Sequence, residues 1–446
     1  MSHKHAIASV LLISAFQLFS VSAFSQGALT PPGAPAPTMK KLDEIEPRIN
    51  LQATPAPAGV DASNASYHFI INQPGSYYLS ANLGVTKANG IQINAEGVTL
   101  DLNGFQISRA GGGSGNGIEI VLTAHRATIR NGSITGFAYG VNSLGTGGGS
   151  PTYARGCAFR DLSVSGCSAY GLLAGNLALI ESCRAHDNAG TAAIYTANGA
   201  VMINCTVDHN TASYGIRAGT GSSLTNCIAR ENTGFTAIST TQGSSLSNCS
   251  AYSNFANFGI DAQAGSSLTN CTAAFNDGGG ATTSAGISAG NQSTVRGCTS
   301  SYNTTAISAT PTTGMGFDIA TGSTIEHCTA AANRGDNINV TSNCVVRENN
   351  CSSGAAGIHV LNSDNRIEGN NVLGAARGID VDAGGNFIVR NSASGNVTNY
   401  DIVAGNFYGT ITNVVPPTGL PTPPPVNGSS ASSSILTADA WANISY

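Results

Sequence analysis

Five cysteines follow one another at intervals of 22 residues, and this regularity limits what the chain can fold into. They are Cys183, Cys205, Cys227, Cys249 and Cys271. An asparagine follows each cysteine by five residues, and Cys298 and Cys328 keep that inner spacing after longer intervals. The asparagines are Asn188, Asn210, Asn232, Asn254, Asn276, Asn303 and Asn333. A fixed period of about 20–50 residues is the signature of a repeat architecture, in which each unit packs on its neighbours.

A second mark recurs in every repeat: an apolar residue that, in the central repeats, follows a small one. Extending it in both directions gives one mark per coil. The marks are Ile91, Ile118, Val141, Leu172, Ile194, Ile216, Ile238, Ile260, Ile287, Phe317, Ile338, Ile358, Ile379 and Tyr400. We therefore expect 14 coils of about 22 residues each.

The apolar runs inside a repeat are too short for helices. Leu224, Cys227 and Ala229 alternate with polar residues around a bend at Asn226, whereas a helix needs about 8 or more residues at a period of 3.6. Asn and Gly tolerate the left-handed backbone of tight corners, and stacked Asn side chains can hydrogen-bond along the stack. The pattern predicts an all-β, single-domain parallel β-helix with three short strands per coil and coils about 4.8 Å apart.

Two segments resemble a known family. GVTLDLNGFQI (Gly97 to Ile107) is similar to the first coil of many bacterial right-handed parallel β-helix proteins, the pectin-lyase-like superfamily, and PPGAPAPTMKKLDEIEPR resembles the leader of an uncharacterised exported group. The resemblance covers residues 67–413 and implies the right-handed sense. The segments NTD, GxDD, GHG and RIK of polygalacturonase-like members do not occur. The calcium-ligand cluster of pectate-lyase-like members cannot be mapped either, so no catalytic residue is carried over.

The segments outside the coils have other compositions. Residues 1–25 have the basic start, apolar stretch and small cleavage-site residues of a signal peptide. Residues 26–66 are a Pro-rich leader with a short cap helix, 414–434 a Pro/Ser linker, and 435–446 a capping strand, because the open ends of a solenoid need cover. We expect a bacterial protein that is secreted, periplasmic or on the cell surface, without a transmembrane segment and monomeric.

The cysteine spacing argues against disulfides along the cysteine series, and the net charge argues against nucleic-acid binding. Residues at one position of stacked coils lie about 4.8 Å apart, farther than the roughly 3.5–4.5 Å between the Cβ atoms of a disulfide. Cys183 to Cys271 are therefore expected to be buried free thiols, while Cys157, Cys167, Cys344 and Cys351 lie outside that series and could pair. A net charge of −5 provides no basic face for nucleic acid.

A first group of charged residues occupies equivalent positions in three successive coils. The members, our candidates for catalysis, are His186, Asp187, Asp208, His209, Arg230 and Glu231. Stacking places His186 over Asp208, with Arg217 nearby as a candidate for substrate binding. Carboxylates and imidazoles held this close can divide into acid and base roles, and glycoside hydrolysis uses carboxylates about 5–9.5 Å apart. Ion pairs that fix the register are the alternative.

A second group directly follows the coil marks near the C-terminus. It comprises Asp318, Asn339, His359, Asp380 and Asp401, with Asp382 alongside. Like charges in adjacent coils are unfavourable unless they are protonated or bridged by a cation. Asp380, Asp382 and Asp401 are therefore candidate calcium ligands, and Asp318 and His359 candidates for substrate binding. A solvated acidic strip is the alternative, and no cofactor is required.

Two functions fit this sequence. The missing catalytic motifs, low charge and uniform polar faces favour a non-catalytic surface or matrix protein that binds glycan or another cell-envelope component. The alternative is a polysaccharide lyase or glycoside hydrolase, and whether the chain is an enzyme is left open. Long insertions at 108–116, 143–153, 276–285 and 303–315 are poor in aromatic residues, so we see no platform for sugar stacking there.

Overall fold

The computed structural model describes residues 48–143, 154–279, 283–304, 314–413, 426–428 and 441–445. These residues belong to one compact unit, Arg48–Tyr446. The expected signal peptide and cap helix, the insertion at 144–153 and most of the Pro/Ser linker lie outside the described residues. No helix in the described part of the chain has the length and apolar character to cross a membrane.

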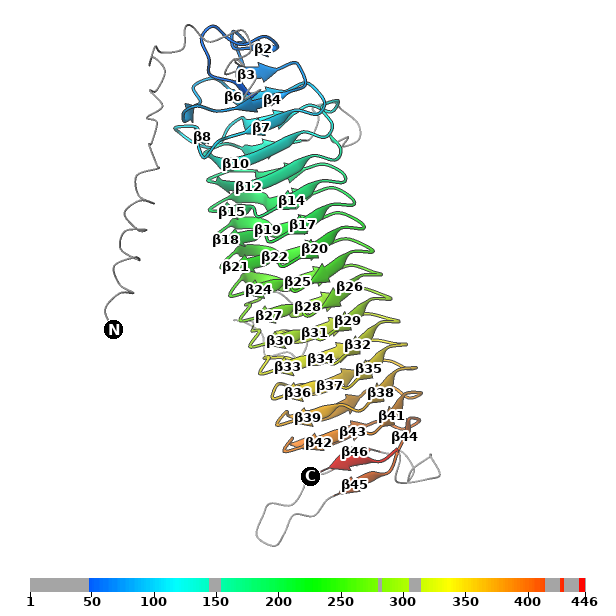
Figure 1. The fold of residues 1–446 in the computed structure, drawn as a ribbon. Coiled ribbons are helices and arrows are strands. Elements are labelled where there is room, and N and C mark those ends of the chain that lie inside the picture. Colours follow the sequence, from blue (N-terminus) through cyan, green and yellow to red (C-terminus); the bar gives the residue numbers. More distant parts are fainter. Residues whose placement is uncertain are drawn as a thin grey trace, which may run out of the picture. The chain divides into compact units, whose positions relative to one another are not determined.

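Every described element is a β-strand, and the strands stack in three parallel ladders (Figure 1). The first ladder contains β1 (Ile49–Asn50), β4 (Ser76–Tyr78), β7 (Thr99–Asp101), the first halves of β10 (Thr128–Thr135) and β12 (Ala158–Ser165), β14 (Leu179–Glu181), β17 (Val201–Ile203), β20 (Ser223–Thr225), β23 (Ser245–Ser247), β26 (Ser267–Thr269), β29 (Thr294–Arg296), β32 (Thr324–Glu326), β35 (Val345–Arg347), β38 (Arg366–Glu368), β41 (Phe387–Val389) and β44 (Phe407–Tyr408).

The second ladder contains β5 (Leu83–Gly84), β8 (Gln106–Ser108), the second halves of β10 and β12, β15 (Arg184–His186), β18 (Thr206–Asp208), β21 (Ile228–Arg230), β24 (Ser250–Tyr252), β27 (Thr272–Ala274), β30 (Thr299–Ser301), β33 (Thr329–Ala331), β36 (Asn350–Ser352), β39 (Asn371–Leu373), β42 (Ser392–Ser394), β47 (Asn443–Ser445) and β45 (Ile411–Asn413). Each coil thus contributes one strand to each ladder, as in β17, β18 and β19, and the prediction of three short strands per coil is confirmed.

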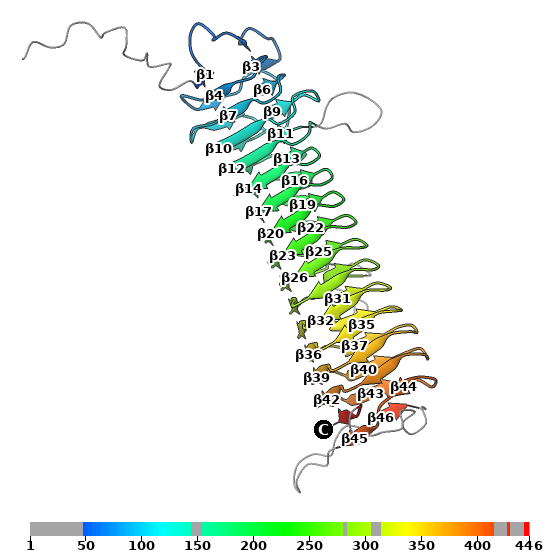
Figure 2. The same ribbon diagram turned by 45° about the vertical axis from the view of Figure 1, so that its right-hand side comes forward.

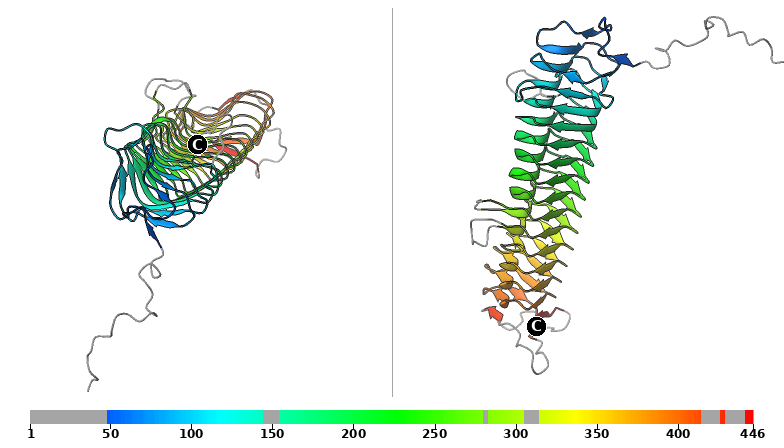
Figure 3. Two further views of the ribbon diagram at one scale, coloured as in Figure 1. Left: turned by 90° about the horizontal axis from the view of Figure 1, so that it is seen from above. Right: turned by 90° about the vertical axis from the view of Figure 1, so that its left-hand side faces the viewer.

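The third ladder contains β3 (Tyr67–Ile71), β6 (Asn89–Ile93), β9 (Asn116–Ile120), β11 (Tyr139–Asn142), β13 (Tyr170–Ala174), β16 (Ala189–Thr196), β19 (Thr211–Ala218), β22 (Thr233–Thr240), β25 (Phe255–Ala262), β28 (Ala285–Ala289), β31 (Met315–Ile319), β34 (Ile338–Val340), β37 (Ala356–Val360), β40 (Arg377–Val381), β43 (Thr398–Ile402) and β46 (Val426–Gly428), with β2 (Val60–Asp61) antiparallel to β3. Figure 2 shows β9 to β25 of this ladder in line. The colours change in chain order along the rod, so each coil packs on its sequence neighbours (Figure 3).

The fourteen coil marks form one continuous column inside the third ladder. Each mark pairs directly with the next, from Ile91 to Tyr400, and all are fully buried. The column continues to Phe69 at one end and Val426 at the other. The predicted marks are therefore confirmed, because a period-2 strand places every equivalent residue on the same face.

The corners of the coils are held by stacked polar side chains. Along the predicted asparagine series, Asn210 Oδ1 accepts from the backbone N–H of Asn188 at 2.9 Å, and its Nδ2 donates to Asn232 Oδ1 at 2.8 Å. The same pattern continues to Asn333, which confirms the expected asparagine ladder. All eleven cysteines are buried and free, which confirms the prediction for Cys183 to Cys271. The four cysteines that could have paired, Cys157, Cys167, Cys344 and Cys351, do not form disulfides.

Two further asparagine ladders were not predicted from the sequence. They run through Asn349, Asn370, Asn391 and Asn443, and through Asn365, Asn386 and Asn406. The first continues the cysteine column, because the backbone N–H of Cys328 donates to Asn349 Oδ1 at 2.9 Å. The same corner position is therefore occupied by Cys in the earlier coils and by Asn in the later ones. Because the residue type changes, the repeat of this position is not visible in the sequence.

Candidate functional site

The first charged group lies at the corner between the second and third ladders. We call His186, Asp187, Asp208, His209, Arg230 and Glu231 the corner cluster. His186 pairs in register with Asp208, as expected, and Asp208 with Arg230. His209 lies in the turn after β18 with a left-handed φ of 56°. This conformation points its side chain away from the strand and leaves 55% of that side chain exposed.

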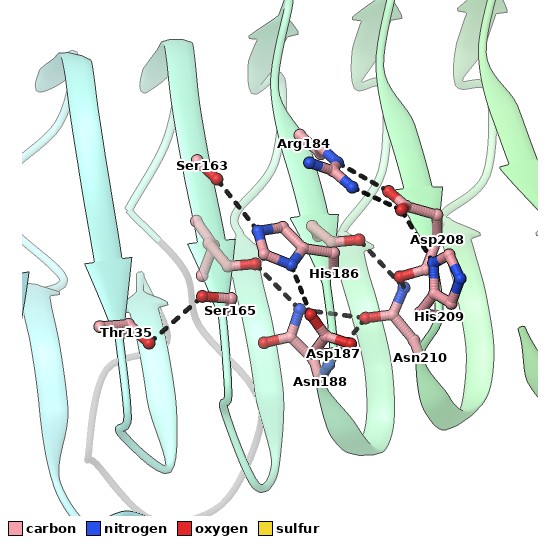
Figure 4. A network of polar contacts seen from close by, with 12 residues as sticks. Thr135, Ser163, Ser165, Arg184, His186, Asp187, Asn188, Asp208, His209 and Asn210 are labelled. Carbon is pink, nitrogen blue, oxygen red and sulfur yellow. Dashed lines mark hydrogen bonds and ion pairs between the residues drawn. The ribbon is translucent and has the colours of Figure 1, made fainter.

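Asp208 is the most tightly held residue of the corner cluster (Figure 4). Its carboxylate is 1% exposed and accepts two hydrogen bonds from Arg184, from Nε at 2.8 Å and Nη2 at 2.6 Å. His209 Nδ1 lies 3.1 Å from Asp208 Oδ2, and His209 Nε2 lies 2.6 Å from Glu231 Oε2. The Arg184 hydrogen bonds lower the pKa of Asp208 to about 2, against burial, which works to raise it. Asp208 is therefore ionised at neutral pH and unsuited to donate a proton.

Within the corner cluster, His186 and Asp187 form a pair of their own. His186 Nδ1 lies 2.7 Å from Asp187 Oδ2, and its Nε2 lies 3.3 Å from Ser163 Oγ. Arg217 does not join the corner cluster; its guanidinium lies on the third ladder, 4.5 Å from the ring centroid of Tyr214. Arg184 was not among the residues predicted from the sequence, although it directly follows Cys183 in the repeat.

Replacing Arg184 with Met should make stability depend differently on pH. The pKa of Asp208 is depressed from 3.8 to about 2 in the folded chain, so the ion pair stabilises fully above pH 3.8 and loses that effect as pH falls through 2. Because Arg184 is half-exposed, we expect a loss of about 1–2 kcal/mol at pH 7, disappearing near pH 2. Urea unfolding across this range measures it. Arg230→Met, which removes a neighbouring charge that makes no hydrogen bond to Asp208 and is the smallest cause of its lowered pKa, should change stability little, and equal losses in both variants would contradict the assignment.

The second charged group forms a column on the outer face of the third ladder. Its members are in register, as predicted from their position after the marks: Asp318, Asn339, His359, Asp380 and Asp401. The column begins earlier than expected, with Asp261 two coils before Asp318. Burial raises the pKa of Asp261 and of Asp318 above the ordinary value of 3.8. Asn339 Nδ2 donates to Asp318 Oδ1 at 3.0 Å.

His359 is surrounded by carboxylates in this column. Its Nδ1 lies 2.7 Å from Asp336 Oδ2, and its Nε2 lies 3.0 Å from Asp382 Oδ2 and 3.7 Å from Asp380 Oδ2. Burial works to lower the pKa of His359, but the hydrogen bonds and charges of Asp336, Asp382 and Asp380 raise it to about 9. Burial raises the pKa of Asp380 to about 6.

Two details of this cluster differ from the expected calcium ligand set. His359, Asp380 and Asp382 each offer a donor atom within 4.8 Å of the others, and Asp401 is not in that group. Asp336, which was not predicted from the sequence, precedes the coil mark Ile338 by two residues. Its role is visible only in the fold, because Asp336 lies outside β34, in the segment just before it, where the alternation of the strand does not predict its side-chain direction.

A row of aromatic rings, which we did not expect, lies on the same outer face. Six strands that are neighbours in the third ladder, from β11 to β25, supply one ring each. The rings are Tyr139, Tyr170, Tyr195, Tyr214, Phe235 and Phe258. The first three rings form one contact series and the last three form another. Within each series the ring centroids of successive coils lie 5.7–6.2 Å apart. We call these six residues the aromatic row. The expectation that no platform for sugar stacking is present concerned the insertions, whereas these six rings come from the regular coils.

A second, shorter stack continues the line of the corner cluster. Tyr252, which pairs in register with Arg230, is followed by Phe275 and Tyr302 in the next coils, with ring centroids 5.5 and 4.9 Å apart. All three side chains are about half exposed. We call them the corner stack.

Comparison with known proteins addresses the fold. A family model described as "Right handed beta helix region" matches residues 89–273 and 236–397. The A-module of the Azotobacter vinelandii mannuronan C-5 epimerase AlgE6 superposes with a TM-score of 0.51 at 14% identity, covering 71% of this chain and 90% of that one. The AlgE4 A-module gives 0.44 at 15% identity, with 71% and 91% covered. Tailspike protein 2 of Escherichia coli O157:H7 bacteriophage CAB120 gives 0.36 at 14%, with 57% and 38% covered.

At this identity the likeness to the AlgE6 module concerns the fold alone. No curated protein matches the sequence. The family matches, by contrast, together span residues 89–397, well over half of the chain. The chain therefore belongs to the right-handed β-helix family, and its three ladders form the right-handed parallel β-helix that the repeat and the resemblance together predicted.

Proposed function

We propose that this protein is exported and binds a polysaccharide along the outer face of its third ladder without changing it chemically. The aromatic row is the observation that carries the proposal, since it places one ring on each of six neighbouring strands. Neighbouring strands lie about 4.8 Å apart, so the row offers a repeated contact along the rod. A repeated contact suits a polymer better than a small molecule.

Ring geometry supports contact with sugars. Tyr170 and Tyr195 meet edge to face at 81°, as do Tyr214 and Phe235 at 73° and Phe235 and Phe258 at 70°. In these pairs successive rings are turned by 70–81°, so ring faces and ring edges alternate from coil to coil. The negative face of an aromatic ring attracts the C–H groups of a pyranose, and tyrosine hydroxyls can hydrogen-bond to its oxygens.

Polar groups beside the aromatic row can hold the substituents of the sugar. Arg217 lies over the Tyr214 ring and provides a cation that is suited to a uronate carboxylate. The charged column from Asp261 to Asp401 follows farther along the same face. A pocket lined by Ala256, Asn276 and Gly314 measures only about 130 Å³ even when its open, solvent-filled part is included, well under the roughly 300 Å³ of small-molecule sites.

Affinity electrophoresis of the full chain in gels containing mannuronan, homogalacturonan or a neutral β-glucan tests this proposal. We expect at least one polymer to retard the protein, and the double variant Tyr214→Ala/Phe235→Ala to bind it about tenfold or more weakly, because each aromatic contact contributes on the order of 1 kcal/mol. Mannuronan is included because it is the polymer named for the AlgE6 module.

The matched control is Tyr252→Ala/Phe275→Ala, which removes two half-exposed, mutually packed rings from the corner stack instead of the aromatic row. Loss of binding in this control but not in the row variant would move the glycan site to the corner. No retardation by any polymer would overturn the proposal.

A polysaccharide lyase or glycoside hydrolase acting at the corner cluster is the alternative. Its support is the chain of contacts from Asp208 through His209 to Glu231, beside the corner stack. The ionised state of Asp208 works against it. New reducing ends or unsaturated products after incubation with the same polymers would contradict a purely binding role, and their loss in Glu231→Gln would assign the reaction to this corner.

A further inference from the structure

The cluster around His359 has features that glycan binding does not explain. Two carboxylates converge on one imidazole nitrogen: Asp382 Oδ2 lies 3.0 Å and Asp380 Oδ2 lies 3.7 Å from His359 Nε2. Ligands about 2.0–2.2 Å from a tetrahedral metal ion lie roughly 3.3–3.6 Å from each other. The separations in the cluster bracket that value, and all three donor atoms lie within 4.8 Å of one another.

Asp380 provides an independent observation that points to a ligand at this cluster. Its side chain is 3% exposed, and its Oδ2 atom has no hydrogen-bond partner among the described residues. Arg377 Nη1 lies 2.8 Å from that oxygen, close enough for an ion pair but without the alignment of a hydrogen bond. A buried carboxylate oxygen without a hydrogen bond is costly, and this one faces His359 Nε2.

Asp336 holds the imidazole in the orientation that a metal ligand needs. It lies beneath the cluster, fully buried, and accepts the backbone N–H of Ala356 at 2.9 Å on one oxygen. The other oxygen lies 2.7 Å from His359 Nδ1. Histidine ligands usually donate their second ring N–H to such a carboxylate, which fixes the tautomer and leaves Nε2 for the metal.

We propose that His359, Asp380 and Asp382 bind a divalent transition-metal ion such as Zn²⁺, with Asp336 as the positioning residue. The metal replaces the proton shared between His359 and Asp382 and coordinates Asp380 Oδ2, which otherwise has ion pairs but no hydrogen bond. One imidazole and two carboxylates suit zinc and its neighbours, whereas calcium takes 6–8 oxygen ligands. The inference is independent of the aromatic row, which lies on the coils before it.

Equilibrium dialysis of the untagged, chelator-treated full chain against ZnCl₂, MnCl₂ and CaCl₂ tests the site. We expect one Zn²⁺ per chain, with Ca²⁺ bound at least about 100-fold more weakly. His359→Gln and Asp382→Asn should each weaken Zn²⁺ binding by about 100-fold, and Asp336→Asn by about 10–100-fold. Substitution with Co²⁺ should give a visible absorption band that Asp336→Asn shifts, which a purely structural role would not produce.

His209→Gln is the matched control. His209 also lies between two carboxylates, but these face opposite ring nitrogens and do not converge on one, so this variant should bind Zn²⁺ like the wild type. Asp382 is half-exposed, which keeps Asp382→Asn informative if His359→Gln fails to fold. No Zn²⁺ uptake, unchanged affinity in Asp382→Asn, or Ca²⁺ bound as tightly as Zn²⁺ would overturn the proposal.

Discussion

Phe317→Ala is expected to lower the free energy of unfolding by about 3–5 kcal/mol. Phe317 is 0% exposed and lies in the column of coil marks between Ile287 and Ile338. Truncation removes apolar contacts and leaves a cavity that the neighbouring coils cannot fill, because their backbones are fixed by hydrogen bonds on both sides. Urea unfolding followed by circular dichroism measures the loss.

Phe235→Ala removes the same atoms from the outer face of the third ladder. Its ring is 47% exposed, so we expect a loss of about 1 kcal/mol or less, arising mainly from its contacts with Tyr214 and Phe258. The result also shows whether the variant used for glycan binding is folded. Similar losses for Phe317→Ala and Phe235→Ala would contradict the assignment of inner and outer faces.

Asn232→Ala is the second substitution with a large expected effect, about 3 kcal/mol. The Asn232 Oδ1 atom accepts from the backbone N–H of Asn210 at 3.1 Å, and its Nδ2 donates to Val207 O at 3.1 Å and Asn254 Oδ1 at 2.9 Å. All these groups are buried in the corner, where water cannot replace the lost partner. Each unsatisfied buried group costs about 1–3 kcal/mol.

Native-state hydrogen exchange can locate this effect. The amide of Asn210 should exchange faster in Asn232→Ala by on the order of 100-fold, which corresponds to about 3 kcal/mol. Asn226→Ala is the control, since Asn226 Nδ2 donates to Asn204 Oδ1 at 3.1 Å on an exposed corner, where water can take its place. Unchanged exchange at Asn210 would mean that the asparagine ladder does not hold the corner.

The sequence alone determined the parts of this protein that repeat. Hydrogen bonding between coils forces residues one period apart into the same place, so a mark read at Ile194 or Ile358 fixed a buried position without knowledge of its neighbours. The asparagine ladder and the free thiols followed by the same argument. Both charged groups were found because their members occupy equivalent positions, as His359 and Asp380 do.

The tertiary structure decided which side chains meet across positions that are not equivalent. Arg184 reaches Asp208 from two residues earlier in the preceding coil, and Asp336 reaches His359 from the segment that precedes β34. The aromatic row shifts its position from Tyr195 to Tyr214 and Phe235, so no fixed spacing in the sequence reveals it. Periodicity constrains the backbone, whereas these contacts depend on rotamers and on local changes of register. The sequence therefore determined the β-helix and the columns that carry charge, and only the folded chain determined which of their side chains touch.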